Sequence, residues 1–127
     1  MMVEQESGRD AVLQVLSDEY MRAILCSTIS NAKSMVEISN ENGIPISTCY
    51  RRVHELVNFH LLKTEKTVIT SNGKKYETFR STLRAATITL LSGKLSVDVV
   101  MNPNTEDKLQ GMLESMRDGS TNAVSKR

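Results

Sequence analysis

The chain has 127 residues, about the size of one domain and too short for an enzyme with separate cofactor and substrate lobes. Its residues are 39% hydrophobic and 24% charged, with two prolines and six glycines, which is typical of a folded domain and unlike a disordered chain. No apolar run approaches the ~18–20 residues of a membrane span, and the polar, acidic start MMVEQESGRD is unlike a signal peptide. We therefore expect a cytoplasmic protein with no membrane partner.

The two cysteines, Cys26 and Cys49, are too few for a disulfide framework and lack the CxxC spacing of a metal or redox pair. Zinc would need these thiols to converge with His54 and His60. Cys49 falls on an apolar helix face, His54 leans toward the surface and His60 lies at a helix-to-strand corner. We expect reduced cysteines, no metal site and no cofactor.

The net charge of +1 conceals an uneven distribution along the chain. Residues 46–84 hold eight Lys or Arg against three Asp or Glu, a local charge of +5, whereas the remainder holds eight against twelve, a charge of −4. A basic middle within an acidic frame indicates that one face meets an anionic partner. The alternative for such a cluster is an ordinary solvated surface.

The N-terminal third of the chain predicts two helices. Residues 9–16 carry Val12, Leu13 and Leu16 at helical spacing, and Ser17 or Asp18 is a good N-cap for the next helix. That helix starts at Glu19 and is expected to end near residues 30–31. Its inward face is formed by Met21, Ile24, Leu25, Thr28 and Ile29.

A pair of helices joined by a tight turn follows. Ser34 and Glu37 form the S-x-x-E pattern of a capping box, and Gly43 supplies the left-handed conformation that ends a helix. After Pro45, Ser47 is expected to cap a further helix over residues 47–59. Its buried stripe comprises Cys49, Val53, Leu56 and Val57, and its other face is polar and basic.

Beyond this helix the hydrophobic period changes from 3.6 to 2, which predicts strands. Residues 62–70 and 76–79 flank the turn Ser71-Asn72-Gly73 and predict a hairpin, because Asn and Gly both tolerate positive φ. A second hairpin joins residues 86–91 to residues 95–101 through Ser92-Gly93. Its alternation places Ile88, Leu90, Leu95, Val97 and Val99 on a buried face.

The C-terminal segment predicts one more helix. Asn104 or Thr105 would cap it, and Leu109, Met112, Leu113 and Met116 form a single stripe. The predicted organisation is then a disordered N-terminus (1–8), a DNA-binding domain (9–84), a second hairpin with a C-terminal helix as a possible dimerisation element (85–117), and a disordered tail (118–127).

Three helices followed by a two-stranded hairpin is the element order of a winged helix-turn-helix domain. Residues 15–63, with LSDEYMRAIL, SMVEISNENGIPISTCYRRVHEL and FHLLK, resemble ArsR-type winged helix-turn-helix transcriptional regulators, especially archaeal members. The resemblance implies a homodimeric transcription regulator whose third helix enters the major groove of double-stranded DNA. The ligand sets of the metal-sensing branch are absent, and the second hairpin is an addition, so the effector is left unknown.

The predicted fold class is therefore α+β: a winged helix-turn-helix, made of a three-helix core and a β-hairpin wing, with a second β-hairpin and a C-terminal helix. The candidate DNA contacts on helix 47–59 are Ser47, Thr48, Tyr50, Arg51 and Arg52. An Arg can pair with guanine O6 and N7, and Thr can contact a thymine methyl. Tyr50 would meet sugar or phosphate, or else pack beside the wing.

Lys74 and Lys75 follow the Asn72-Gly73 turn, where a wing tip would meet the phosphate backbone or the minor groove. For these lysines and for both arginines, the alternative is solvation at the surface. The chain contains no phosphate-binding glycine loop, no HExxH and no GxSxG motif, so we do not expect an enzyme. With 4% aromatic residues it also lacks the composition of an RNA-stacking sheet.

Three hypotheses stand at this level. The first is a sequence-specific, dimeric DNA-binding transcriptional regulator that reads the major groove with helix 47–59. The alternative is a winged-helix protein-interaction module that docks an acidic partner in the transcription machinery. A third, compatible with the first, is an effector sensor with a cavity between the helices and the second hairpin.

Overall fold

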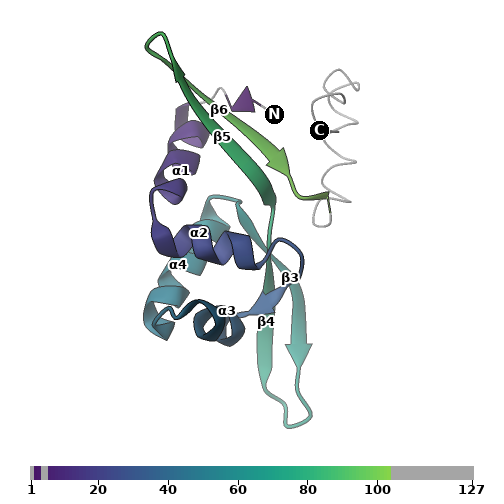
Figure 1. Ribbon diagram of the computed structural model, residues 1–127. Coiled ribbons are helices and arrows are strands. Elements are labelled where there is room, and N and C mark those ends of the chain that lie inside the picture. The colour runs from purple at the N-terminus through teal and green to yellow at the C-terminus, as the bar shows by residue number, and fades with distance from the viewer. Residues whose placement is uncertain (1, 4–5, 104–127) are drawn as a thin grey trace.

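The computed structural model describes residues 2–3 and 6–103, apart from the side chains of residues 6 and 7. Over these residues the fold is mixed α+β, with four helices and two antiparallel three-stranded sheets (Figure 1). The elements are, in chain order, β1 (Met2–Val3), α1 (Glu6–Leu16), α2 (Glu19–Ser27), β2 (Lys33–Ser34), α3 (Met35–Asn42), α4 (Ile46–Asn58), β3 (Leu62–Ile69), β4 (Lys75–Ser81), β5 (Leu83–Leu91) and β6 (Lys94–Met101).

The start of α2 and both ends of α3 confirm the local signals in the sequence, whereas the expected end of α2 near residues 30–31 is wrong, because α2 ends at Ser27 with Thr28 as its C-cap. Asp18 caps α2 by accepting a hydrogen bond of 2.9 Å from the Met21 backbone N–H. Ser34 and Glu37 form the complete capping box of α3: Ser34 Oγ accepts from Glu37 N–H, and Glu37 Oε1 accepts from Ser34 N–H. Gly43 ends α3 with φ of 64°, a left-handed conformation that costs glycine little.

The start of α4 differs from the prediction. The N-cap is Pro45, with no side-chain cap, and the helix already includes Ile46, so the expected cap at Ser47 is wrong. Pro45 has φ of −54°, close to the helical value, and its carbonyl accepts the first helical bond from Cys49 N–H at 2.8 Å. Ser47 consequently lies inside the first turn with an exposed side chain.

The core lies where α2, α3 and α4 meet the β2–β4–β3 sheet. The predicted inward faces of α2 and α4 are confirmed. The fully buried side chains there include Met21, Ile24, Ile38, Cys49, Val53, Leu56 and Leu62. Val36 of α3 lies outside this core and is 60% exposed.

The first sheet has the strand order β2–β4–β3. The predicted hairpin is present as β3 and β4, but only Gly73 takes positive φ, and Asn72 does not. Gly73 N–H donates to the carbonyl of Thr70, so the connection is a turn closed by a left-handed glycine. The two-residue strand β2 adds to β4 and fixes the start of α3 on this sheet.

The second sheet has the order β1–β6–β5, with β5 at the edge. The predicted turn is confirmed, because Ser92 and Gly93 both have positive φ. The predicted burial is right for Val97 and Val99 of β6 but wrong for Ile88 and Leu90 of β5, which are 41% and 72% exposed. Val97 and Val99 join Val12 and Val15 of α1 in the core, whereas Ile88, the cross-strand partner of Val97, is exposed, so the cover on this face lies over β6 and leaves β5 open.

The N-terminal segment also differs from the expected disorder. Met2 and Val3 pair with Asp98 and Val97 of β6, and α1 begins at Glu6 rather than near Arg9. The predicted C-terminal helix and the tail 118–127 lie outside the described residues. None of the helices in the described part of the chain is long and apolar enough to cross a membrane.

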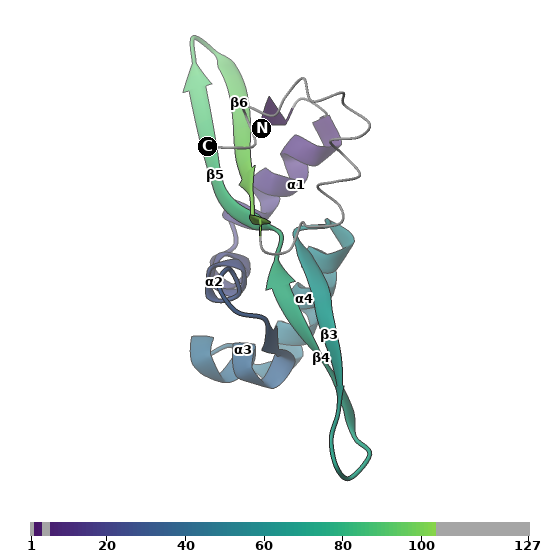
Figure 2. The ribbon, with the colours of Figure 1, turned by 90° about the vertical axis from the view of Figure 1, so that its right-hand side faces the viewer.

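A buried asparagine joins the two sheets to the turn after α2. Asn102 is 1% exposed, and its Nδ2 donates to the carbonyls of Ile29 at 2.8 Å and Ser81 at 3.0 Å. The β3–β4 hairpin and the β5–β6 hairpin extend from this junction toward opposite ends of the molecule (Figures 1 and 2).

Candidate nucleic-acid interface

Helix α4 exposes a continuous polar stripe. Its buried side is formed by Cys49, Val53 and Leu56. Side chains three and four residues apart share a helix face, so the exposed members recur with that spacing. This α4 stripe consists of Ser47, Tyr50, Arg51, His54 and Asn58, all exposed. Tyr50 and His54 stack on each other along it, with ring centroids 6.2 Å apart and an interplanar angle of 24°.

The structure separates Arg51 from Arg52. Arg51 is exposed on the stripe, whereas Arg52 is held against the fold. Arg52 Nη2 lies 3.0 Å from Asp18 Oδ2, and its Nη1 lies 3.3 Å from Glu55 Oε1. Asp18 is the N-cap of α2, so this arginine ties α4 to the start of α2. Of the two predicted arginine contacts, only Arg51 is left with an exposed side chain.

The remaining predicted residues of α4 differ in how exposed their side chains are. Ser47 is exposed at the beginning of the stripe, and Thr48 is half-buried beside it. Tyr50 is 52% exposed near the middle. The stripe therefore brings together Ser47, Tyr50 and Arg51 but places Thr48 at its margin.

The tip of the β3–β4 hairpin carries both predicted lysines. Lys74 and Lys75 are exposed, and the turn before them is held by Thr70. The Lys74 N–H donates to Thr70 Oγ1 at 3.0 Å and the Thr70 N–H donates to the Lys74 carbonyl at 2.7 Å. Two exposed cations thus follow a turn that is closed by hydrogen bonds between Thr70 and the Lys74 backbone.

A groove of about 730 Å³ runs between α4 and β4 and joins these two basic elements. Tyr50 and His54 line it from α4, and Lys75 and Tyr76 line it from β4. Val36 of α3 closes one side. The groove shows that the α4 stripe and the base of the hairpin tip form one continuous surface.

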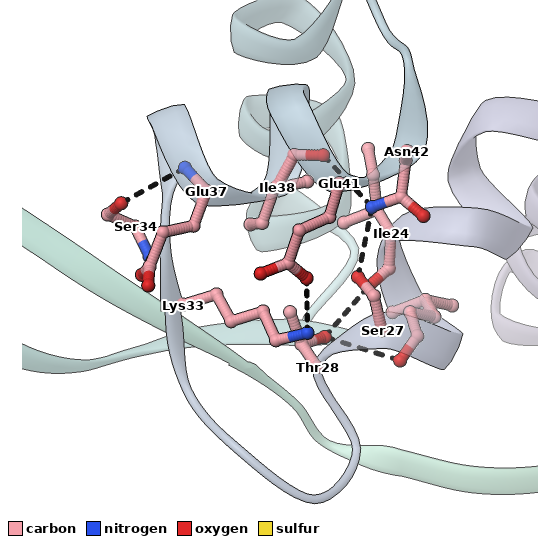
Figure 3. A network of polar contacts seen from close by, with 10 residues as sticks. Ile24, Ser27, Thr28, Lys33, Ser34, Glu37, Ile38, Glu41 and Asn42 are labelled. Carbon is pink, nitrogen blue, oxygen red and sulfur yellow. Dashed lines mark hydrogen bonds and ion pairs between the residues drawn. The ribbon is translucent and has the colours of Figure 1, made fainter.

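The orientation of α3, which precedes α4, is fixed by polar contacts with α2 and β2 (Figure 3). Asn42 Nδ2 donates to the carbonyl of Ile38 at 2.9 Å and to Ser27 Oγ of α2 at 3.3 Å. Lys33 of β2 forms an ion pair with Glu41 of α3. These contacts set where α4 begins and hence which of its side chains face outward.

Among the residues of this surface that were absent from the sequence prediction are His54 and Tyr76. His54 follows Tyr50 by four residues and Ser47 by seven, so the 3.6-residue period alone could have placed it on the stripe. Tyr76 is 43% exposed in the groove and carried no comparable signal. Its position depends on how β4 packs beside α4.

The described residues give little support to a metal site or to a reactive thiol at Cys49. Among them there is no group of three or more His, Cys, Asp or Glu that could hold a metal ion. Burial raises the pKa of the Cys49 thiol, and its Sγ lies 3.8 Å from the carbonyl of Met35 as a donor. A protonated, buried thiol is a poor nucleophile and a poor metal ligand.

An apolar crevice of about 170 Å³ lies between α1 and the second hairpin, where the effector hypothesis placed a cavity. Ala11 and Val12 of α1 line it together with Val99 and Met101 of β6. It offers no charged side chain to orient a ligand. The crevice by itself therefore identifies no effector.

The candidate interface thus combines the α4 stripe, two lysines at the hairpin tip and the groove between them. Arg51, Lys74 and Lys75 supply positive charge, and Tyr50 supplies an aromatic face. In comparisons with known proteins, the chain matches no protein-family model and no curated sequence.

Proposed function

We propose that this protein is a winged helix-turn-helix transcriptional regulator that binds double-stranded DNA in a sequence-specific manner as a dimer. In this proposal α4 enters the major groove and the β3–β4 hairpin is the wing. The observation that carries it is the exposed α4 stripe, with Arg51 at its centre, beside a hairpin tip with Lys74 and Lys75.

The element order supports the fold assignment. From α2 to β4 the chain runs helix, short strand, helix, helix, strand, strand, and β2 pairs with β4. This order agrees with the ArsR-type resemblance of residues 15–63. The turn between α3 and α4 spans only residues 43–45 and includes the left-handed Gly43, as a helix-turn-helix requires.

The charge and the shape of the surface support nucleic acid as the ligand. A recognition helix reads bases through side chains of its first turns, which on α4 are Ser47, Tyr50 and Arg51. Arg51 would pair with a guanine through its two-pronged guanidinium, and Ser47 would bind a base edge or a phosphate. Lys74 and Lys75 would contact the phosphate backbone from the wing.

The proposal is tested by selecting bound duplexes from a random library at ~150 mM salt, then titrating the selected and a scrambled site. We expect a palindromic motif bound ~10³-fold or more above the scrambled site, since specific regulators exceed nonspecific binding by such ratios. Arg51→Ala should reduce the preference at one base pair by ~1–3 kcal/mol.

Arg22→Ala is the matched control, because Arg22 is an exposed arginine on α2, outside both the α4 stripe and the β3–β4 hairpin. It should leave the base preference unchanged. Equal binding of selected and scrambled duplexes would contradict the proposal.

One observation favours a second function, a module that docks an acidic protein segment. The groove beside α4 exposes apolar surface, with Val36 at 60%, Tyr50 at 52% and Tyr76 at 43%. Grooves that bind peptides are lined by such apolar and aromatic side chains, which bury apolar side chains of the partner. Weak, sequence-indifferent DNA binding together with saturable binding of an acidic peptide would favour this function.

A further inference from the structure

Strand β5 is an open sheet edge. Within residues 2–3 and 6–103 it pairs with β6 on one side and has no strand neighbour on the other. Its last two residues and Ile88 are large apolar side chains that stay in solvent: Ile88 is 41%, Leu90 72% and Leu91 70% exposed. Such an edge offers unpaired backbone groups and apolar side chains together, which is a template for another strand.

The protection of β5 against strand pairing is confined to its beginning, where it carries Arg84 and a register shift between Leu83 and Ala85. The rest of the strand, residues 85–91, reads AATITLL, with no charge and no proline. An outer strand of the other sheet, β3, contains Lys63, Glu65 and Lys66 and a register shift between Thr64 and Lys66. Charges and bulges are devices that keep edges apart, so β3 is protected along its length whereas residues 85–91 of β5 are not.

We propose that β5 is a dimerisation strand, which pairs antiparallel with β5 of a second copy about a two-fold axis at Ile88. This inference deepens the dimeric part of the proposed function and does not depend on DNA binding. The β1–β6–β5 sheets of the two copies would join into one six-stranded sheet. The α4 stripe would stay free, because the β3–β4 and β5–β6 hairpins point to opposite ends of the molecule (Figure 2).

The backbone geometry favours this register. Leu91 and Lys94 flank the two-residue turn Ser92-Gly93, and such flanking residues form a hydrogen-bonded pair. In an antiparallel ladder hydrogen-bonded and non-hydrogen-bonded pairs alternate. Ala86, Ile88 and Leu90 therefore direct their N–H and C=O groups away from β6, toward the open edge.

The side chains are self-complementary in the same register. With Ile88 opposite its own copy, Ala86 lies opposite Leu90 of the second copy and Ala85 lies opposite its Leu91. Thr87 lies opposite Thr89 of the second copy. Small residues face large ones, apolar residues face apolar ones, and no like charges are opposed, which cross-strand pairing requires.

The experiment is a charge swap at the proposed two-fold axis. Light scattering should show a dimer of the wild-type chain at ~10 µM, with Ile88→Lys and Ile88→Glu each monomeric because two like charges face each other. We expect each substitution to raise the dimer Kd by ~100-fold or more. Mixing the two variants should restore a dimer of one copy of each. Thr67→Lys on exposed β3 is the control and should stay dimeric.

Three outcomes would overturn the proposal: a wild-type monomer at ~100 µM, an Ile88→Lys variant that stays dimeric, or no dimer in the mixture. A monomer would indicate that another segment of the same chain covers β5. Should both charged variants fail to fold, Ile88→Cys in a Cys26→Ser background decides the matter. Directly opposed residues lie ~5.5 Å apart between Cα atoms, within disulfide reach, so mild oxidation should give a covalent dimer.

An Ile88→Cys variant that gives no covalent dimer would overturn the register, and Thr67→Cys in the same background is its control. All these measurements are made without DNA. A failed dimer leaves DNA binding by α4 to be judged separately, and a dimer without DNA binding would overturn only the proposed function.

Discussion

Arg52 of α4 and Asp18 at the start of α2 form an ion pair with 3.0 Å between Nη2 and Oδ2. The other oxygen of the same carboxylate accepts the N-terminal hydrogen bond of α2 from Met21 N–H. One carboxylate thus caps one helix and holds another. Because Arg52 is occupied in this way, the α4 stripe presents Arg51 as its arginine.

Asp18→Ala should destabilise the protein more than Arg52→Ala does. Losing the cap costs ~1 kcal/mol and losing the partly exposed ion pair costs ~0.5–1 kcal/mol, so we expect about 1.5–2 kcal/mol against about 0.5–1 kcal/mol. Urea unfolding of both variants and of the double variant measures the coupling. Additive effects would mean that the ion pair contributes nothing to stability.

The two serines that the sequence marks as caps should behave differently. Ser34→Ala removes one half of the α3 capping box and should cost ~1 kcal/mol of unfolding free energy. Ser47→Ala, at an exposed position without a capping bond, should change stability by less than ~0.5 kcal/mol. The two unfolding curves test this directly, and equal losses would contradict the helix start at Ile46. A stable Ser47→Ala protein also makes its DNA binding interpretable.

If the proposed DNA binding holds, Lys74 and Lys75 at the tip of the β3–β4 hairpin should act without regard to base sequence. If each lysine neutralises one phosphate, a bound dimer of the Lys74→Ala, Lys75→Ala double variant loses four phosphate contacts. The double substitution should weaken binding to all duplexes alike and reduce the salt slope of log K by ~3.6. Titrations of selected and scrambled sites at several salt concentrations measure this slope. A change in base preference would instead place these lysines at base edges.

Cys49 should make stability fall at alkaline pH. Burial raises its pKa above the ordinary thiol value, so the folded state keeps the proton and the unfolded state loses it as pH rises. The contribution of the Cys49 thiol to the unfolding free energy is therefore full below the thiol pKa of the unfolded state and is lost as pH rises through the thiol pKa of the folded state. The unfolding free energies of wild type and Cys49→Ala can be compared between pH 8 and pH 11, a range that includes the usual thiol pKa of ~8.5. The unfolding free energy should decline more steeply with pH for wild type. Parallel curves would rule this linkage out.

Reactivity toward a thiol reagent gives an independent check on the same residue. Cys26 is exposed and Cys49 is buried, so one thiol should react at once and the other only on unfolding. Rapid reaction of two thiols in the native protein would contradict the burial of Cys49.

The second hairpin shows where pattern reasoning succeeds and where it stops. The Ser92-Gly93 turn could be predicted, because Ser-Gly is a turn-forming dipeptide in which the glycine accepts positive φ. The alternation that predicted burial of Val97 and Ile88 is the same on both strands. Only the cover differs: Val97 and Val99 pack in the core with Val12 and Val15 of α1, whereas β5 lies at the edge of the sheet.

The sequence by itself determined the features that depend on residues a few positions apart: the capping box of Ser34 and Glu37, the left-handed Gly43, the two hairpin turns and the buried side of α4. Local hydrogen bonds and backbone preferences act within one turn, so no distant segment can change them easily. The tertiary structure decided which polar groups are left for a ligand. Arg52 forms an ion pair with Asp18, 34 positions earlier, and the buried Asn102 donates hydrogen bonds to the carbonyls of Ile29 and Ser81. Such contacts follow from packing, which the linear spacing of residues does not encode.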